Sequence, residues 1–127
     1  MGALKKILIV DDDPNSRHIM ISALKKLSAH TIEADNGLTA KELLKNSKPL
    51  PSLILLDLMM PEMDGFGLID FLQKSEELRK IPVIVITAKE LTLEERIRLT
   101  NTTEKVIQKS SSIKDIVANI CQQINNK

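Results

Sequence analysis

The sequence predicts an α/β fold, in which helices cover both faces of a five-stranded parallel sheet. Short apolar runs alternate with stretches of helical periodicity five times along the chain. Strands that alternate with helices of this length form βαβ units around a parallel sheet, and their right-handed crossovers place helices on both faces. The chain has 127 residues, so one doubly wound domain over residues 1–127 is expected.

Each predicted strand is a run of four or five residues that is rich in aliphatic side chains. The runs ILIV at 7–10, LILL at 53–56 and VIVI at 83–86 are uninterrupted, as is typical of strands buried on both faces of a parallel sheet. The second and fifth strands contain polar residues and fit this pattern least well. The predicted strands cover residues 6–10, 30–34, 53–56, 82–86 and 104–108.

Local sequence features mark where the helices begin. Asp13 precedes a proline, which suits a helix cap followed by proline at the first helical position. Asn36-Gly37 indicates a turn before the second helix, and Asp64 is the natural cap of the third. Isoleucine and valine recur at helical spacing near the end of the chain, so the last helix is expected to pack one face on the sheet. The predicted helices cover residues 14–27, 37–47, 64–75, 92–101 and 112–125.

The composition argues against several classes of protein. A net charge of +1 gives no electrostatic reason to expect binding to nucleic acid or to an acidic membrane surface. No apolar run has the length of a membrane span, and no signal peptide or lipidation motif is present, so a cytoplasmic location is expected. The single cysteine, Cys121, cannot form an internal disulfide and is predicted to be a buried small residue.

Carboxylates follow two of the predicted strands directly. Asp11 and Asp12 come after the first strand, and Asp57 comes after the third. Open α/β sheets bind ligands at the carboxyl ends of their strands, so these side chains are expected to meet in one crevice. Crowded carboxylates repel one another unless a cation compensates them, and oxygen ligands favour a hard ion, Mg²⁺ or Mn²⁺. The sequence therefore predicts a metal-dependent site built from Asp11, Asp12 and Asp57.

The same edge of the sheet gathers further polar groups. Asp57 could be a metal ligand, a nucleophile or both, because carboxylates form acyl phosphates. Asp11 and Asp12 cannot point the same way from an extended strand, so one is expected to reach the metal directly and the other through water. Thr87 and Lys109 follow the fourth and fifth strands and would add a hydroxyl and an ammonium group. A carboxylate, a metal, a hydroxyl and a cation together are what phosphoryl transfer needs.

Four motifs in this order and spacing resemble the receiver domain of bacterial two-component response regulators: ILIVDDDP at 7–14, LILLDLMMPEMDG at 53–65, VIVITA at 83–88 and VIQKS at 106–110. The resemblance covers essentially the whole chain and implies a flavodoxin-like (βα)₅ fold. It implies a phosphoacceptor signalling domain of a phosphorelay, which turns over no external substrate and is not an enzyme in that sense. The run Gln-Lys-Ser-Ser at 108–111 further resembles receivers attached to hybrid sensor histidine kinases.

The resemblance implies roles for the acidic residues. Asp57 would be the phosphoacceptor, which takes a phosphoryl group from a phosphohistidine on a histidine kinase or a histidine phosphotransfer domain. Asp12, Asp57 and the backbone carbonyl of Met59 would bind Mg²⁺ directly. Asp11 would act on the ion through water.

The resemblance also implies how phosphorylation is read. Thr87 and Lys109 match the hydroxyl and the lysine that contact the phosphoryl oxygens in this family. Those contacts would bias a two-state surface formed by helix 92–101, strand 104–108 and helix 112–125. Such domains also form homodimers through this face, and a homodimer is therefore a further expectation.

Two residues depart from the family pattern, and two others bear on the lifetime of the phosphoryl group. Val106 replaces the usual aromatic residue of the last strand, so no ring can report phosphorylation there. Ser110 replaces a proline that often follows a cis peptide, and a trans peptide or a rearranged loop is expected. Met59 cannot hydrogen-bond an attacking water, and Lys89 would compete for phosphate oxygens. Slow self-dephosphorylation is therefore predicted.

Two other functions stay open at this stage. A receiver fold that serves only as a docking surface, independent of phosphorylation, would fit the changes at Val106 and Ser110. A haloacid-dehalogenase-type phosphatase would use Asp57 as its nucleophile. Such enzymes want a second aspartate two residues further on, where Met59 stands, and a cap or a larger core than 127 residues normally provide.

Overall fold

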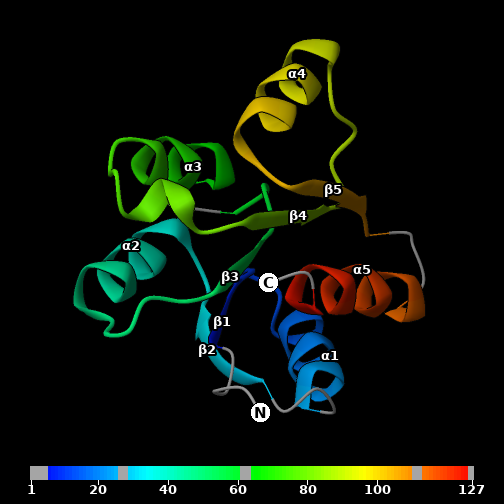
Figure 1. Cartoon of the computed structure of the whole chain (residues 1–127). Helices are drawn as coiled ribbons and strands as arrows, with labels where there is room; N and C mark the ends of the chain where they lie inside the picture. The colour runs from blue at the N-terminus through cyan, green and yellow to red at the C-terminus, as the bar shows by residue number, and fades with distance from the viewer. Residues whose placement is uncertain (1–5, 26–28, 61–63, 110–112, 126–127) are drawn as a thin grey trace.

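The computed structural model describes residues 6–25, 29–60, 64–109 and 113–125, and it shows a five-stranded sheet between two layers of helices (Figure 1). The strand pairs are all parallel, in the order β2-β1-β3-β4-β5 across the sheet. The strands are β1 (Lys6–Val10), β2 (His30–Ala34), β3 (Leu53–Leu56), β4 (Val83–Thr87) and β5 (Lys105–Gln108). The helices are α1 (Pro14–Lys25), α2 (Gly37–Asn46), α3 (Gly65–Gln73), the 3₁₀ helix η1 (Leu78–Lys80), α4 (Leu93–Thr102) and α5 (Ile113–Asn125).

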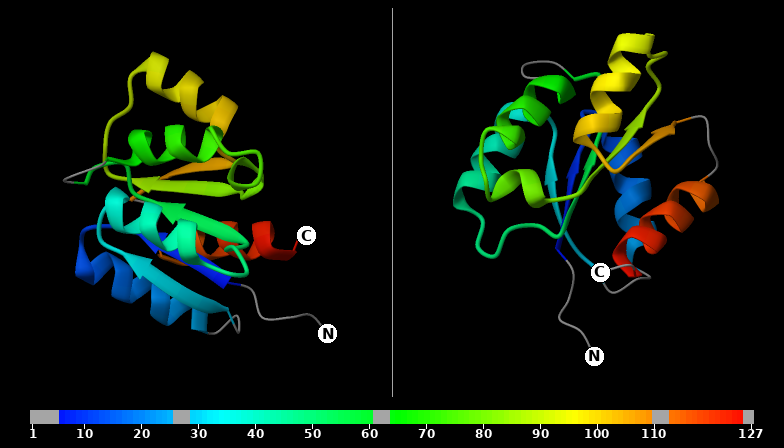
Figure 2. Two further views of the ribbon diagram at one scale, coloured as in Figure 1. Left: turned by 90° about the vertical axis from the view of Figure 1, so that its left-hand side faces the viewer. Right: turned by 45° about the horizontal axis from the view of Figure 1, so that its top comes forward.

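Successive residues of each central strand pack against different helices. Leu8 and Leu56 belong to a buried cluster with residues of α2, α3 and α4. Ile9 and Leu55 belong to a second cluster with residues of α1 and α5. This alternation is what a strand buried on both faces produces, because neighbouring side chains point to opposite faces. The views in Figure 2 show the same three layers, which confirm the predicted doubly wound α/β fold.

The polar residues of β2 and β5 are explained by their position. Both strands lie at the edges of the sheet, where one side of the strand is open to solvent. His30 and Glu33 of β2 are exposed, as is Lys105 of β5. The interior is aliphatic, and each fully buried leucine or isoleucine stabilises the fold by about 1.5–3 kcal/mol.

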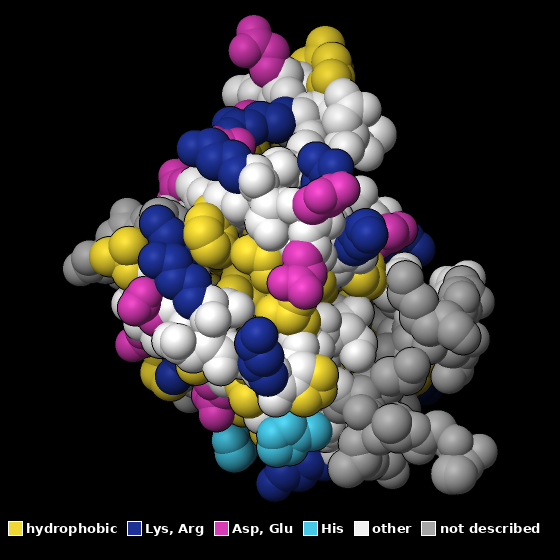
Figure 3. Space-filling model, turned by 60° about the vertical axis from the view of Figure 1, so that its left-hand side comes forward, with side chains coloured by type: hydrophobic (Ala, Val, Ile, Leu, Met, Phe, Trp, Pro, Cys, Tyr) yellow, Lys and Arg dark blue, Asp and Glu magenta, His cyan; other side chains and the backbone are white. Residues whose placement is uncertain are grey.

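Surface charge is mixed in sign. On the side that carries α2 and α3, basic and acidic side chains are interspersed around hydrophobic ones (Figure 3). This fits the net charge of +1 and gives no broad patch of one sign on the face shown. None of the helices in the described part of the chain has the length and hydropathy that a bilayer crossing requires.

The boundaries of the predicted strands and helices need only small corrections. β4 runs from Val83 to Thr87 and β5 begins at Lys105, each one residue later than predicted. The short η1 helix was not predicted, because three residues carry no helical periodicity. The prediction for Cys121 was wrong in degree, since this residue of α5 is only half-buried.

Candidate functional site

The acidic residues leave the sheet where its strand order reverses. The chain passes from β1 to β2 on one side and to β3 on the other, so a crevice lies between the carboxyl ends of β1 and β3. The Asp57 amide donates to the carbonyl of Val10 at 2.9 Å, and the Asp11 amide donates to the carbonyl of Ala34 at 3.1 Å. These two bonds extend the strand pairing by one residue, so the backbone of both aspartates is fixed by the sheet.

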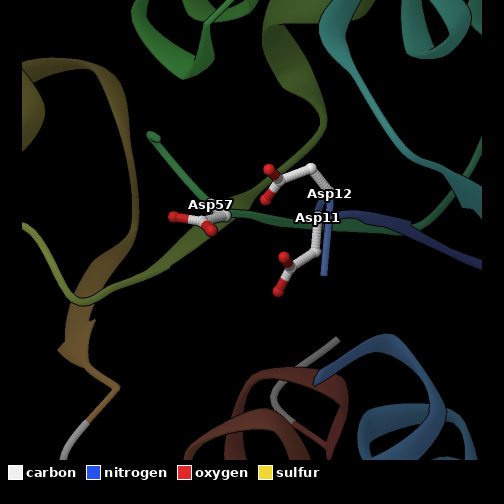
Figure 4. Close-up of side chains that lie close together, drawn as sticks. All are labelled: Asp11, Asp12 and Asp57. Carbon is white, nitrogen blue, oxygen red and sulfur yellow. The ribbon is translucent and has the colours of Figure 1, made fainter. Parts of the chain in front are cut away.

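The side chains of Asp11, Asp12 and Asp57 converge at this point (Figure 4). One carboxylate oxygen from each lies within 4.8 Å of the others. Asp11 and Asp57 are only 5% and 6% exposed, whereas Asp12 is exposed. Three carboxylates at this separation repel one another, and their oxygen-only donor set fits a hard divalent cation. The cluster predicted from the sequence is therefore present.

Lys109 brings a positive charge into the cluster from the end of β5. Its ammonium nitrogen lies 3.1 Å from Asp11 Oδ2 and 3.0 Å from Asp57 Oδ2. Its backbone amide donates to the carbonyl of Thr87 at 2.8 Å, which holds the end of β5 against β4. Burial alone would lower the pKa of Lys109, but its hydrogen bonds to Asp57 and Asp11 and their charges outweigh burial and raise the pKa. The ammonium group therefore remains charged at neutral pH.

Asp11 is the most desolvated partner of this lysine. Burial raises the pKa of Asp11 above its ordinary value, although the Asp13 amide and Lys109 both favour its charged form. The Asp13 amide donates to Asp11 Oδ1 at 2.9 Å. Both oxygens of Asp11 are thus engaged by the protein.

The loop after β3 is fixed close to Asp57. The Met59 amide donates to Asp57 Oδ1 at 3.2 Å, and the Met59 side chain is 57% exposed. Gly65, at the start of α3, donates to the carbonyl of Leu58 at 3.2 Å. A Cβ atom at Gly65 would lie 2.7 Å from Leu58 Cα, so only glycine permits this approach. The predicted metal contact of the Met59 carbonyl stays a prediction.

Thr87 is fully buried at the end of β4, as its place in the sequence predicts. Its hydroxyl oxygen accepts the amide hydrogen of Lys89 at 3.1 Å, so the hydroxyl proton remains available to an incoming acceptor. The Lys89 ammonium lies 3.5 Å from Glu95 Oε2. Glu95 and Thr92 form a reciprocal capping box at the start of α4.

A hollow of about 460 Å³ opens beside the acidic cluster. Its wall is apolar at Phe66 and Met60 and charged at Asp12, Lys89 and Glu95. Among the described residues, no hydrogen bond or ion pair holds the carboxylate of Asp12, which faces this hollow. The exposed side of the cluster is therefore open to an ion or to a partner.

Other predicted residues fall outside the cluster. Asp13 and Asp64 cap their helices, accepting the amides of Asn15 at 3.0 Å and Gly67 at 2.9 Å. Val106 is half-buried against the core of α2, α3 and α4. Ser110 lies outside the described residues, and so does the prediction made for its peptide bond.

One residue that contacts the site was missed by the sequence analysis. Arg17 of α1 donates from Nη1 to the carbonyl oxygen of Asp11 at 2.7 Å and from Nε to Glu33 Oε1 at 3.0 Å. The contact depends on how the first turn of α1 packs against β2. No pattern in the sequence indicates it.

Known proteins share this arrangement. Residues 7–121 match the family described as the response regulator receiver domain. Protein PilH of Pseudomonas aeruginosa is 34% identical over 87 residues, which are 68% of this chain and 70% of PilH. The signal receiver domain of a signal transduction histidine kinase from Syntrophus aciditrophicus is 28% identical, with a TM-score of 0.83 over 96% of this chain and 91% of that chain.

A metal-bound structure is also similar. The Mn²⁺-bound form of response regulator Rcp1 is 27% identical, with a TM-score of 0.78 over 91% of this chain and 88% of that chain. Several curated relatives are much longer, and this chain spans between 10% and 33% of their length.

Proposed function

This chain belongs to the response regulator receiver domain family, and from that premise we propose that Asp57 is the residue on which it accepts a phosphoryl group. Receiver domains are phosphoacceptor signalling domains of two-component systems, and they bind a divalent metal at an acidic pocket. They interact with histidine kinases or phosphotransfer proteins. The observation that carries the proposal is the meeting of Asp11, Asp57 and Lys109, which follow three different strands, within 3.1 Å of one ammonium nitrogen.

In the proposed reaction, a carboxylate oxygen of Asp57 attacks the phosphorus of a phosphohistidine. A P–O bond forms, the P–N bond breaks, and its electron pair remains on the imidazole nitrogen of the donor. Lys109 already contacts Asp57 at 3.0 Å, so it can offset charge that develops on the phosphoryl oxygens. The Thr87 hydroxyl would donate its free proton to one of those oxygens. Both groups act by position and charge, which is what this class of reaction requires.

We propose that Asp11, Asp12 and Asp57 hold Mg²⁺, with the carbonyl of Met59 as a further ligand. Three ionised carboxylates carry three negative charges and Lys109 offsets one of them, so two negative charges remain for a divalent ion. The ion, when bound, would neutralise charge on the transferring group. Mn²⁺ is the alternative, and it is the ion in the similar Rcp1 structure.

The donor is proposed to be a histidine kinase or a histidine phosphotransfer domain, and the readout surface to be α4, β5 and α5. A hollow of about 250 Å³ beside Val106, between α4 and β5, gives this surface room to change. The likeness to a receiver domain of a histidine kinase supports an origin in a hybrid kinase. The single domain over residues 1–127, the homodimer, the cytoplasmic location and the absence of nucleic-acid and membrane contacts stay predictions.

The test is incubation with Mg²⁺ and acetyl phosphate, followed by mass spectrometry of the intact protein. The expected result is one phosphate per chain, none on Asp57→Asn and none when the metal is chelated. Asp70→Asn, which changes an exposed carboxylate of α3, is the matched control and should be labelled like the unchanged protein. Continuous hydrolysis of the donor would indicate a phosphatase instead. Equal labelling of Asp57→Asn would refute the assignment of the phosphoacceptor.

A further inference from the structure

We propose that Arg17 is a positioning residue, which sets the direction of the Asp12 carboxylate through the backbone of Asp11. This inference rests on the function proposed above, because it concerns the metal site of that reaction. Arg17 bridges three elements: it lies on α1, its Nη1 donates to the Asp11 carbonyl at 2.7 Å beyond β1, and its Nε pairs with Glu33 of β2 at 3.0 Å. The bond to Asp11 is short and charge-assisted, which makes it one of the stronger kinds of hydrogen bond.

Asp12 needs such an outside constraint more than its neighbours do. The Asp11 carboxylate is held by the Asp13 amide and by Lys109, and the Asp57 carboxylate by the Met59 amide and by Lys109. The Asp12 carboxylate is exposed and has no such partner in the described part of the chain. Its direction is therefore set by the backbone that carries it.

The Asp11 carbonyl is the part of the backbone that controls this direction. The carbonyl of Asp11 and the amide of Asp12 belong to one rigid peptide plane. On one side of the plane, the Asp11 amide is bonded to Ala34 of β2 at 3.1 Å, and on the other side Asp13 begins α1. With both sides anchored, the remaining freedom is rotation of the plane, and the bond from Arg17 fixes that rotation.

Arg17 is itself well placed for this task. Its side chain is 18% exposed, and two of its nitrogens contact two different acceptors. The rigid fork of a guanidinium group can make both contacts at once, whereas the single nitrogen of lysine is a point charge without that geometry. Glu33 is half exposed, so the ion pair adds little stability and serves to orient the guanidinium group.

A purely structural role of Arg17, as a tie between α1 and β2, makes a different prediction. Loss of a structural tie lowers the stability of the whole domain and leaves the affinity of the folded site for metal unchanged. Loss of a positioning contact weakens metal binding, because outer contacts that orient ligands typically affect metal affinity about 10–100-fold.

The experiment measures Mg²⁺ and Mn²⁺ binding to the unphosphorylated protein by isothermal titration calorimetry. We expect Arg17→Ala to bind Mg²⁺ about 10-fold more weakly, Arg17→Lys to recover only part of the loss, and Glu33→Gln to lose less than Arg17→Ala. Arg98→Ala is the matched control. Arg98 is also an ion-paired arginine, with both carboxylate oxygens of Asp70 at 2.8 Å, but it lies on α4. It should lose stability without losing metal affinity.

A second measurement separates affinity from chemistry. The initial rate of labelling by acetyl phosphate is followed against Mg²⁺ concentration, and Arg17→Ala is expected to need more Mg²⁺ for half of its maximal rate while reaching a similar maximum. Asp12→Ala must lose metal binding in the same assay. If Asp12→Ala binds normally, the metal site proposed above is wrong and this inference falls with it. If Asp12→Ala fails to bind while Arg17→Ala binds within about twofold of the unchanged protein, only the role of Arg17 is overturned.

Discussion

The two sides of the acidic cluster are held in different ways. On the buried side, Asp11 and Asp57 share the Lys109 ammonium at 3.1 and 3.0 Å, and each also accepts a backbone amide. On the open side, Asp12 and the exposed Met59 side chain line a hollow of about 460 Å³. Asp12 has no hydrogen-bond or ion-pair partner in the ranges that the structure describes.

This difference separates what must be ready before the reaction from what must stay accessible. The buried side is preorganised, so its charges need little rearrangement when a phosphoryl group arrives. The open side exposes a carboxylate, which an ion can reach from solvent and whose direction would come only from the backbone. Changes on the buried side should therefore affect both stability and chemistry, whereas changes on the open side should affect binding and lifetime.

The largest effect is expected when the buried side loses its cation. In Lys109→Met, Asp11 and Asp57 keep their burial but lose the ammonium group, so the free energy of unfolding should fall by about 1–3 kcal/mol without metal. Labelling by acetyl phosphate should slow about 100-fold. Urea unfolding and the labelling rate measure the two effects. Lys105→Met, on the same strand but exposed, is the control, and an equal loss in that variant would contradict the comparison.

The next effect is the stabilisation of the domain by metal. Because the ion would bind only the folded protein, a tenfold excess of Mg²⁺ over its dissociation constant should raise the free energy of unfolding by about 1.4 kcal/mol. The gain should vanish in Asp12→Ala and grow in Lys109→Met at a fixed Mg²⁺ concentration, where no ammonium offsets the carboxylates. Thermal unfolding with and without Mg²⁺ measures it. A gain in Asp12→Ala equal to that of the unchanged protein would mean that the ion binds elsewhere.

The position of the buried side could be predicted from the sequence because it follows from the strands. Asp11 and Asp57 directly continue uninterrupted apolar strands, and parallel strands release their next residues at one edge of the sheet. Thr87 and Lys109 come from strand ends in the same way. Residue order along a strand fixes such positions without any knowledge of side-chain packing.

The contacts that depend on packing between helices and strands were not predicted. Arg17 reaches Asp11 and Glu33 only because α1 begins where it does beside β2. The pairing of Glu95 with Lys89 was also missed, although the Thr-x-x-Glu pattern at 92–95 is a signature of a capping box and could have revealed half of it.

On the open side, the expected effect is on the lifetime of the phosphoryl group. The isolated domain should lose its phosphate slowly, because the apolar Met59 cannot orient water and Lys89 would engage phosphate oxygens. Met59→Asn and Lys89→Ala should each shorten the half-life several-fold, with Lys41→Ala on α2 as the control. The measurement is release of phosphate after the donor has been removed. A half-life of seconds for the unchanged protein would contradict this prediction.

The smallest effect is expected at the far wall of the hollow, where Glu95 closes the capping box of α4. The backbone amide of Thr92 and then the charge of Lys89 lower the pKa of Glu95 below its ordinary value. A carboxyl group whose pKa is lowered on folding stabilises the folded state above its unfolded pKa, and that contribution is lost as pH falls through the lower, folded value. Glu95→Gln should therefore be less stable than the unchanged protein at pH 7, and the gap should close on acidification below about pH 4. Urea unfolding at the two pH values measures this, and Glu94→Gln, an exposed neighbour outside the capping box, should show no such closing gap.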